Sequence, residues 1–312
     1  MMRKIIIFLA LLVLFVSIGA VSAEENFTAL QEEINSSTDS IEITQDYVYD
    51  NTTDYEIRSG IIINKSDFSI NGNGYTIDAS NQARIFNITG NNITINNLHF
   101  INGNSFKKDG GAIYALGSIT LNNVTFTNNY ADAGGAIFSN VTLAINNATF
   151  IGNGAKWGGD IYSRNKTDIF NSIFSNSTSK YAAAIYAKGN ITVRDSIFRD
   201  LSANETAGAI GIKDFNNIEI NNCTFINTKA VKNAGAIFID VYKTTGITYI
   251  VNSTFTNTSG DYGGALVQLG GKLYIECCEF VNNTASFDGG AIYISYTDTF
   301  FNNTSIIGNH VS

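Results

Sequence analysis

The stretch NVTFTNNYADAGGAI, residues 123–137, contains the two sequence anchors that decide the fold. The first anchor is Phe126, and the second is the run Gly134-Gly135-Ala136-Ile137. The run recurs along the chain, with substitutions in some copies. The fourth residue of the run falls at positions 113, 137, 161, 185, 210, 237, 266 and 292. Successive copies are therefore 24 to 29 residues apart, which identifies an internal repeat.

The phenylalanine anchor recurs in step with the glycine run. Its copies are Phe100, Phe126, Phe150, Phe174, Phe198, Phe225, Phe255 and Phe280, with Ile306 in the ninth position. Between the anchors, segments such as Ile119-Thr120-Leu121 alternate with the period of a β-strand, which a helical repeat would not show. A propeller blade of four strands needs about 40 residues, so the unit is too short for that fold. The repeat predicts an all-β fold, a right-handed parallel β-helix of about ten coils, in which each strand pairs with its equivalent in the next coil.

The unusual composition agrees with this fold. The chain has 312 residues and no proline, and a stacked parallel strand needs its backbone N–H groups for the ladder. A column of asparagines lies three residues before the phenylalanine anchor. Because a buried amide can bond to the equivalent amide one coil away, we expect a buried asparagine ladder. Its members are Asn97, Asn123, Asn147, Asn171, Asn222, Asn252 and Asn303, interrupted by Asp195 and Cys277.

The N-terminal residues 1–23 are predicted to be a secretory signal peptide. Arg3 and Lys4 precede an apolar run from residue 5 to residue 16, and small residues at 21–23 offer a cleavage site. An uncleaved N-terminal anchor is the alternative. No later apolar run is long enough to span a membrane. The chain is therefore expected to insert into a membrane only through this peptide.

Residues 24–60 are expected to cap the first coil, and residues 61–312 to form the repeats. Phe27, Leu30 and Ile34 lie on one face of a short predicted helix that would cover the open end. No C-terminal cap is recognisable. The last coil is therefore expected to be an open edge that could associate with another chain, unless the sequence is part of a longer protein.

The paired anchors resemble a known family of repeats. Phe126-Thr127-Asn128-Asn129, Phe150-Ile151-Gly152-Asn153 and Phe280-Val281-Asn282-Asn283 are each followed by a Gly-Gly pair. This pattern resembles the F-x-x-N and G-G-A-[ILV] repeats of chlamydial polymorphic outer-membrane proteins. It is similar, more closely, to the adhesin-like surface proteins of methanogenic archaea, within the pectin-lyase-like β-helix superfamily. The resemblance implies a secreted or cell-surface protein with an adhesive role, but it assigns no site residues.

Charge and motifs exclude several functions. The formal net charge of -8 argues against nucleic acid or an anionic membrane as a partner. The exported part of the chain has no paired aspartates and no Gly-His-Gly, which polysaccharide-cleaving β-helix enzymes would need. No catalytic residue, metal ligand or cofactor is therefore predicted.

Asp160 is the most unusual single residue. It replaces the alanine of the Gly-Gly-Ala-Ile run and lies close to Trp157, the only tryptophan. The two side chains could supply a polar contact and a stacking ring for a sugar, or Asp160 could be a tolerated substitution on a solvated strand.

The position of Asp160 also predicts which way the strand faces. A lone carboxylate should avoid a dry core, so the alanine row is expected to face solvent and the isoleucine row to face inward. The residue after each isoleucine would then be exposed as well. This row is mostly aromatic and predicts an exposed stripe for contact with glycans or another protein, formed by Tyr114, Phe138, Tyr162, Tyr186, Phe238 and Tyr293. The alternative is that the rings are buried and the alanines face out.

We therefore expect a non-catalytic, adhesin-like protein, extracellular or at the cell surface, whose partners are glycans or surface proteins. A polysaccharide lyase or glycoside hydrolase of the β-helix class is the first alternative. An inert spacer that holds another domain away from the envelope is the second.

Overall fold

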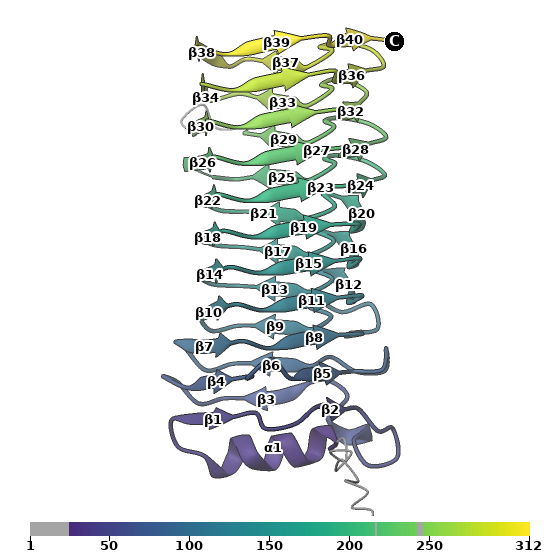
Figure 1. Cartoon of the computed structure of the whole chain (residues 1–312), viewed down its shortest axis with the longest axis vertical. Coiled ribbons are helices and arrows are strands. Elements are labelled where there is room, and N and C mark those ends of the chain that lie inside the picture. The colour runs from purple at the N-terminus through teal and green to yellow at the C-terminus, as the bar shows by residue number, and fades with distance from the viewer. Residues whose placement is uncertain (1–24, 216, 242–245) are drawn as a thin grey trace, which may run out of the picture.

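The computed structural model describes residues 25–215, 217–241 and 246–312, and the predicted signal peptide lies outside them. The chain forms a right-handed parallel β-solenoid, drawn in Figure 1 as a tall stack with helix α1 (Phe27–Ser36) at one end. The two longest sheets have 11 strands each, so the predicted β-helix is confirmed with about one coil more than expected. None of the described helices is long and apolar enough to cross a membrane.

Four parallel sheets run along the stack, and we number them in the order in which one coil visits them. Sheet I contains β1 (Ser40–Glu42), β4 (Ser69–Asn71), β7 (Ile93–Asn96), β10 (Ile119–Asn122), β14 (Leu143–Asn146), β18 (Thr167–Phe170), β22 (Ile191–Arg194), β26 (Asn217–Asn221), β30 (Ile247–Val251), β34 (Lys272–Glu276) and β38 (Asp298–Asn302). Sheet II contains β2 (Tyr47–Val48), β5 (Thr76–Asp78), β8 (His99–Ile101), β11 (Thr125–Thr127), β15 (Thr149–Ile151), β19 (Ile173–Ser175), β23 (Ile197–Arg199), β27 (Thr224–Ile226), β31 (Thr254–Thr256), β35 (Glu279–Val281) and β39 (Ser305–Ile307).

The other two sheets complete each coil. Sheet III contains β12 (Tyr130–Ala133), β16 (Gly154–Trp157), β20 (Thr178–Tyr181), β24 (Ser202–Ala203), β28 (Lys229–Ala230), β32 (Ser259–Gly260), β36 (Thr284–Ala285) and β40 (His310–Val311). Sheet IV contains β3 (Ile61–Ile63), β6 (Phe86–Ile88), β9 (Ile113–Ala115), β13 (Ile137–Ser139), β17 (Ile161–Ser163), β21 (Ile185–Ala187), β25 (Ile210–Lys213), β29 (Ile237–Asp240), β33 (Leu266–Leu269) and β37 (Ile292–Ser295).

The phenylalanine anchors form the centre of the core. The rings from Phe100 to Phe280 are fully buried and stack along the solenoid axis, with each ring nearly parallel to the next. Phe150, for example, lies 5.0 Å from Phe126 and 4.7 Å from Phe174 between ring centroids. Each coil thus contributes one phenylalanine ring to a single continuous stack, which explains why this residue recurs once per repeat.

The glycine run makes the corner between sheets III and IV. Gly134 has a φ of 65°, a left-handed conformation that glycine adopts without strain. A Cβ on Gly135 would lie 2.2 Å from the carbonyl oxygen of Gly159 in the next coil. The first glycine therefore turns the chain, and the second lets neighbouring coils approach closely.

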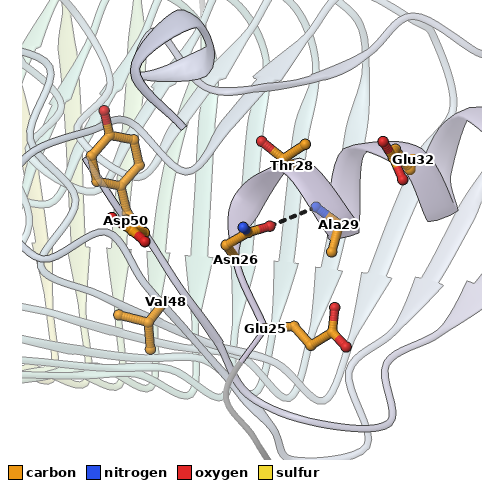
Figure 2. A pocket seen from close by; sticks show the side chains of 8 residues that line it. Glu25, Asn26, Thr28, Ala29, Glu32, Val48 and Asp50 are labelled. Carbon is orange, nitrogen blue, oxygen red and sulfur yellow. Dashed lines mark hydrogen bonds between the residues drawn. The ribbon is translucent and has the colours of Figure 1, made fainter. Parts of the chain in front are cut away.

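Helix α1 covers the N-terminal coil, as predicted, and buries Phe27, Leu30 and Ile34. Asn26 begins the helix, and its side-chain oxygen accepts a hydrogen bond from the backbone N–H of Ala29 at 2.9 Å (Figure 2). At the other end, the ammonium group of Lys65 donates to the backbone oxygens of Ile34, Asn35 and Ser37. This cation satisfies carbonyls at the negative end of the helix dipole.

Asp54, which precedes the 3-10 helix η1 (Tyr55–Ile57), fixes α1 to the first coil. This carboxylate is fully buried. Its oxygens accept hydrogen bonds from the backbone N–H groups of Phe27 at 3.1 Å, Thr28 at 2.9 Å and Asp50 at 2.8 Å, and from the Thr28 hydroxyl at 2.7 Å. One side chain thus joins the helix N-terminus to the loop that follows β2.

Replacing this carboxylate should loosen the cap without unwinding the stack. Asp54→Ala leaves buried N–H groups unpaired, so we expect the cap to lose about 2–3 kcal/mol of stability. Hydrogen–deuterium exchange should show much faster exchange of the α1 amides, with the strands near β15 unchanged. Glu32→Ala, which removes an exposed carboxylate of α1, is the control. Equal protection of α1 in Asp54→Ala and the wild type would contradict this role.

At the opposite end, the last coil presents apolar side chains to solvent. Ile306 is 52% exposed, whereas its equivalent one coil earlier, Phe280, is fully buried. Phe301, Ile307 and Val311 are also exposed. Association of another chain at this edge stays a prediction.

The asparagine ladder is where the sequence prediction of burial is wrong. Asn97 is only partly buried, and the remaining members, Asn123, Asn147, Asn171, Asn222, Asn252 and Asn303, are exposed. All seven have φ between 44° and 55°, because each makes the left-handed corner between sheets I and II with its side chain pointing outward. The amides do bond between some coils, as Asn123 Nδ2 does to Asn97 Oδ1 at 3.1 Å. The column is thus a hydrogen-bonded ladder at the surface.

A buried amide column lies instead three residues after the phenylalanine anchor. Asn129 and Asn153 are buried, and Asn129 Nδ2 donates to Asn153 Oδ1 at 2.9 Å. Asn153 Nδ2 also donates to the backbone oxygen of Phe126 at 3.1 Å. These are the asparagines of the F-x-x-N pattern, so that motif marks the interior polar column.

Candidate functional site

The predicted aromatic stripe exists as a column but not as an exposed surface. Phe138, Tyr162, Tyr186 and Phe238 are only 2–6% exposed, and Tyr114 and Tyr293 are partly buried. From Tyr114 to Tyr186, each ring stacks on the next at 5.1 to 5.5 Å between centroids, so neighbouring rings cover one another's faces. The rings form a second apolar cluster beside sheet IV, separate from the main core, together with Trp157 and Tyr181. The prediction of an exposed stripe for flat contact is therefore wrong.

The prediction that Asp160 faces solvent is also wrong. Asp160 is fully buried, as are Ala136 and Ala184 in the same row. Its Oδ1 accepts hydrogen bonds from Asn153 Nδ2 at 2.8 Å and from the Ser177 hydroxyl at 2.6 Å, while Oδ2 has no partner among the described residues. Burial raises the pKa of this carboxyl to about 8, although the bonds from Ser177 and Asn153 act in the opposite direction. The interior asparagine column thus accommodates a carboxyl group that has no access to a substrate.

Trp157 contributes to a hollow of about 300 Å³ at the corner of sheets III and IV, which we call the corner hollow. The Trp157 ring is partly exposed and stacks on Tyr181 at 3.9 Å between centroids. Phe138 and Tyr162 line the hollow with Trp157, and four charged residues complete it: Asp109, Asp132, Arg164 and Lys188. Trp157 is therefore a predicted site residue whose partly exposed ring lines a hollow next to charged groups.

A second hollow lies on sheet III, which we call the sheet-III groove, with a volume of about 510 Å³. Tyr130 stands at one end with 47% of its surface exposed. A Cβ on Gly154 would lie 2.7 Å from the Tyr130 ring, so the ring extends over the next coil across a residue without a side chain. The lining residues are Tyr130, Ala131, Gly154, Ala155, Thr178, Ser179, Lys180, Ser202 and Asn204.

The groove combines one aromatic wall with small polar groups. Thr178 is exposed, Ser202 is partly exposed, and the Ser179 hydroxyl is buried without a hydrogen-bond partner in the described chain. Lys180 lies at the rim, with its ammonium group 4.0 Å from a Glu205 carboxylate oxygen. Hydroxyl and ammonium groups beside one exposed ring are suited to a polar ligand that has an apolar face.

Sequence reasoning missed Tyr130, although its signal was present in the repeat. The equivalent residues in the following coils are Gly154, Thr178, Ser202, Lys229, Ser259, Thr284 and His310. All of these are glycine or polar, so Tyr130 is the one residue of this described column with a large apolar ring.

Sequence reasoning also missed an aromatic column on the outer face of sheet I. Tyr249, Tyr274 and Phe300 stack at 4.9 and 4.8 Å, with 43% of Tyr249 and 54% of Phe300 exposed. The alternation of each strand carries the signal, because these rings lie between inward-facing residues. Among the described residues, no three histidine, cysteine, aspartate or glutamate side chains are grouped as a metal site would need.

A third hollow, about 570 Å³, lies beside α1 and is lined by Glu25, Glu32 and Asp50 among others (Figure 2). These three carboxylates are exposed, and the neighbouring polar contacts of Asn26 belong to the helix cap. We assign no function to it.

Comparison with known proteins agrees with the repeat. A comparison with curated proteins finds no match. Residues 123–140 and 278–295 match the repeat of the Chlamydia polymorphic membrane proteins. Both segments contain a complete F-x-x-N motif and a complete Gly-Gly-Ala-Ile run, and both lie within the solenoid. In these two segments of its parallel β-helix, the chain is thus similar to the repeat of the Chlamydia polymorphic membrane proteins.

Proposed function

We propose that the protein is exported, is displayed at the cell surface, and binds glycans there without cleaving them, through the sheet-III groove. The observation that carries the proposal is the exposed ring of Tyr130 beside a floor of small residues and a polar rim. Display at the surface is supported by the predicted signal peptide and by the repeat's similarity to that of a membrane protein family.

The groove matches the chemistry of a sugar. One face of a sugar ring carries C–H groups that pack on an aromatic ring, and its hydroxyls exchange hydrogen bonds with side chains such as Thr178, Ser202 and Asn204. The lining residues come from four successive coils, from Tyr130 to Asn204, and neighbouring strands lie about 4.8 Å apart. A chain of sugars can therefore be contacted by several coils at once.

Binding without cleavage is supported by the groups in the groove. Among the described residues that line it, none is a carboxylate or a histidine, the usual acids and bases of polysaccharide cleavage. Asp160, the residue that sequence analysis singled out, is fully buried.

The proposal is tested by a glycan array probed with the chain from Glu24 onward, run beside a lyase and hydrolase screen on the same polysaccharides. We expect retention of a defined set of glycans and no release of products. Turnover of a polysaccharide would favour the enzyme alternative. Absence of binding to every glycan, with the protein folded by circular dichroism, would favour the spacer and overturn the proposal.

A further inference from the structure

The charged groups of the corner hollow are arranged by sign. Asp109 precedes β9, and Asp132 lies in β12 of sheet III. Arg164 follows β17 and Lys188 follows β21, so both cations stand at the C-terminal ends of neighbouring strands of sheet IV. Two carboxylates from one side and two cations from the other thus meet at a hollow whose lining includes the partly exposed Trp157.

In the described part of the chain, the four charged side chains lack direct polar partners. Within the described chain, none of them forms an ion pair within 4.0 Å or a side-chain hydrogen bond. Arg164 and Lys188 contact only rings, with the Arg164 guanidinium 5.2 Å from the Phe138 centroid and the Lys188 ammonium 6.0 Å from that of Tyr162. The nearby Arg84 donates to the backbone oxygens of Ser59, Asp109 and Gly110 and forms no ion pair with a carboxylate in the described chain. Four unpaired charges therefore border one hollow.

Asp109 and Asp132, the two carboxylates of the corner hollow, are partly buried. Burial raises the pKa of Asp109 and the like charge of Asp132 acts in the same direction, whereas the positive charges of Arg164 and Arg84 lower it. A cation placed between the two carboxylates would relieve their repulsion, and an anion placed between Arg164 and Lys188 would do the same for the cations. The arrangement is complementary to a ligand that carries both charges.

We propose that the corner hollow binds a small zwitterion, a molecule with an ammonium group and a carboxylate joined by a short body that packs against Trp157 and Tyr162. The ammonium group contacts Asp109 and Asp132, and the carboxylate contacts Arg164 and Lys188. A volume of about 300 Å³ holds roughly ten waters at about 30 Å³ each, which is the size of an amino acid or of one charged amino sugar. This site is separate from the sheet-III groove and does not depend on glycan binding there.

Calorimetric titration of the folded protein with matched probes tests the proposal. L-Phenylalanine represents a free amino acid, and muramic acid represents a sugar with an amino group and a carboxylate. Phenylalaninamide lacks the carboxylate, whereas N-acetylphenylalanine and N-acetylmuramic acid lack the ammonium group. At least one zwitterion should bind with a dissociation constant of about 1 mM or tighter. Each blocked form should bind about tenfold or more weakly than its parent, and the parent that binds identifies the source of the ligand.

Two variants test which charged residue of the hollow contacts which group of the ligand. Arg164→Gln should weaken the zwitterion about tenfold and leave the weak binding of phenylalaninamide unchanged, while Asp132→Asn should weaken both. Lys166→Gln is the matched control, because Lys166 is an exposed cation two residues away that pairs with Asp168. The proposal is overturned if neither zwitterion binds at 10 mM (roughly −2.7 kcal/mol), if the blocked forms bind as well as their parents, or if Lys166→Gln has the effect of Arg164→Gln.

Discussion

Phe150→Ala is expected to lower the free energy of unfolding by about 3–5 kcal/mol. Phe150 is fully buried at the centre of the phenylalanine stack, between Phe126 and Phe174. Removing its ring leaves a cavity that the neighbouring coils cannot fill, because their backbones are held by parallel strand pairing on both sides. Urea denaturation followed by circular dichroism measures the loss.

Ile151→Ala is the matched control for this measurement. Ile151 follows Phe150 in β15, but its side chain points outward and is 36% exposed. Its replacement should change the unfolding free energy by no more than about 0.5 kcal/mol. A similar loss for the two variants would show that the phenylalanine stack is not the centre of the core.

The second large effect concerns pH and Asp160. In the folded protein the pKa of this carboxyl is raised to about 8 by burial, whereas in the unfolded chain it is about 3.9. Between these values the unfolded chain has lost the proton and the folded protein keeps it. The contribution of Asp160 to stability is therefore most favourable below about pH 4, falls as pH rises, and levels off above about pH 8.

Asp160→Ala should remove this dependence. The unfolding free energy of the wild type minus that of the variant is expected to fall between pH 4 and pH 8, with a slope of at most about 1.4 kcal/mol per pH unit. Alanine already occupies the equivalent positions one coil away, at Ala136 and Ala184. The variant is therefore expected to fold, and to be the more stable of the two at pH 8. Denaturation at pH 4, 6 and 8 gives the difference directly.

The control for the pH series is Asp288→Ala, which removes an exposed carboxylate from a turn. Its difference from the wild type should show no such fall with pH. A difference for Asp160→Ala that stays constant from pH 4 to pH 8, or that rises, would contradict the buried, protonated carboxyl.

The sequence was sufficient to predict the architecture because the repeat encodes it directly. The spacing of Phe126 and Gly134 gave the coil, and the apolar face of Phe27, Leu30 and Ile34 gave the capping helix. Each of these predictions rests on periodicity and local packing, which depend on residues close together in the chain or repeated at a fixed interval.

The sequence did not predict correctly which side chains face the interior at the corners between sheets. There, the direction of a side chain depends on the backbone conformation of the corner residue. Asn97 and Asn129 are both repeated asparagines, but Asn97 has a left-handed backbone that turns its side chain outward, whereas Asn129 points inward. Spacing alone does not distinguish these two positions. The expectation for Asp160 is wrong for a separate reason: a carboxylate avoids the core only when it lacks donors, and Asn153 and Ser177 both donate to this one.

The candidate sites were harder to predict because they join separate coils. Asp132 and Arg164 border one hollow although they lie 32 positions apart, Asp132 in a strand of sheet III and Arg164 just after a strand of sheet IV. Burial of the ring column also depends on stacking between coils, which covers the faces of rings such as Tyr162. A row of aromatic residues in the sequence is compatible with both an exposed stripe and a covered stack.

The most direct test of glycan binding through the sheet-III groove is the dissociation constant of the strongest array ligand for Tyr130→Ala, measured by calorimetry. Tyr262→Ala is the matched control, because Tyr262 is also an exposed tyrosine, at 40%, and does not line the groove. We predict that Tyr130→Ala weakens binding at least about tenfold, equivalent to about 1.4 kcal/mol, and that Tyr262→Ala binds as the wild type does. Unchanged affinity in a folded Tyr130→Ala protein would contradict the account.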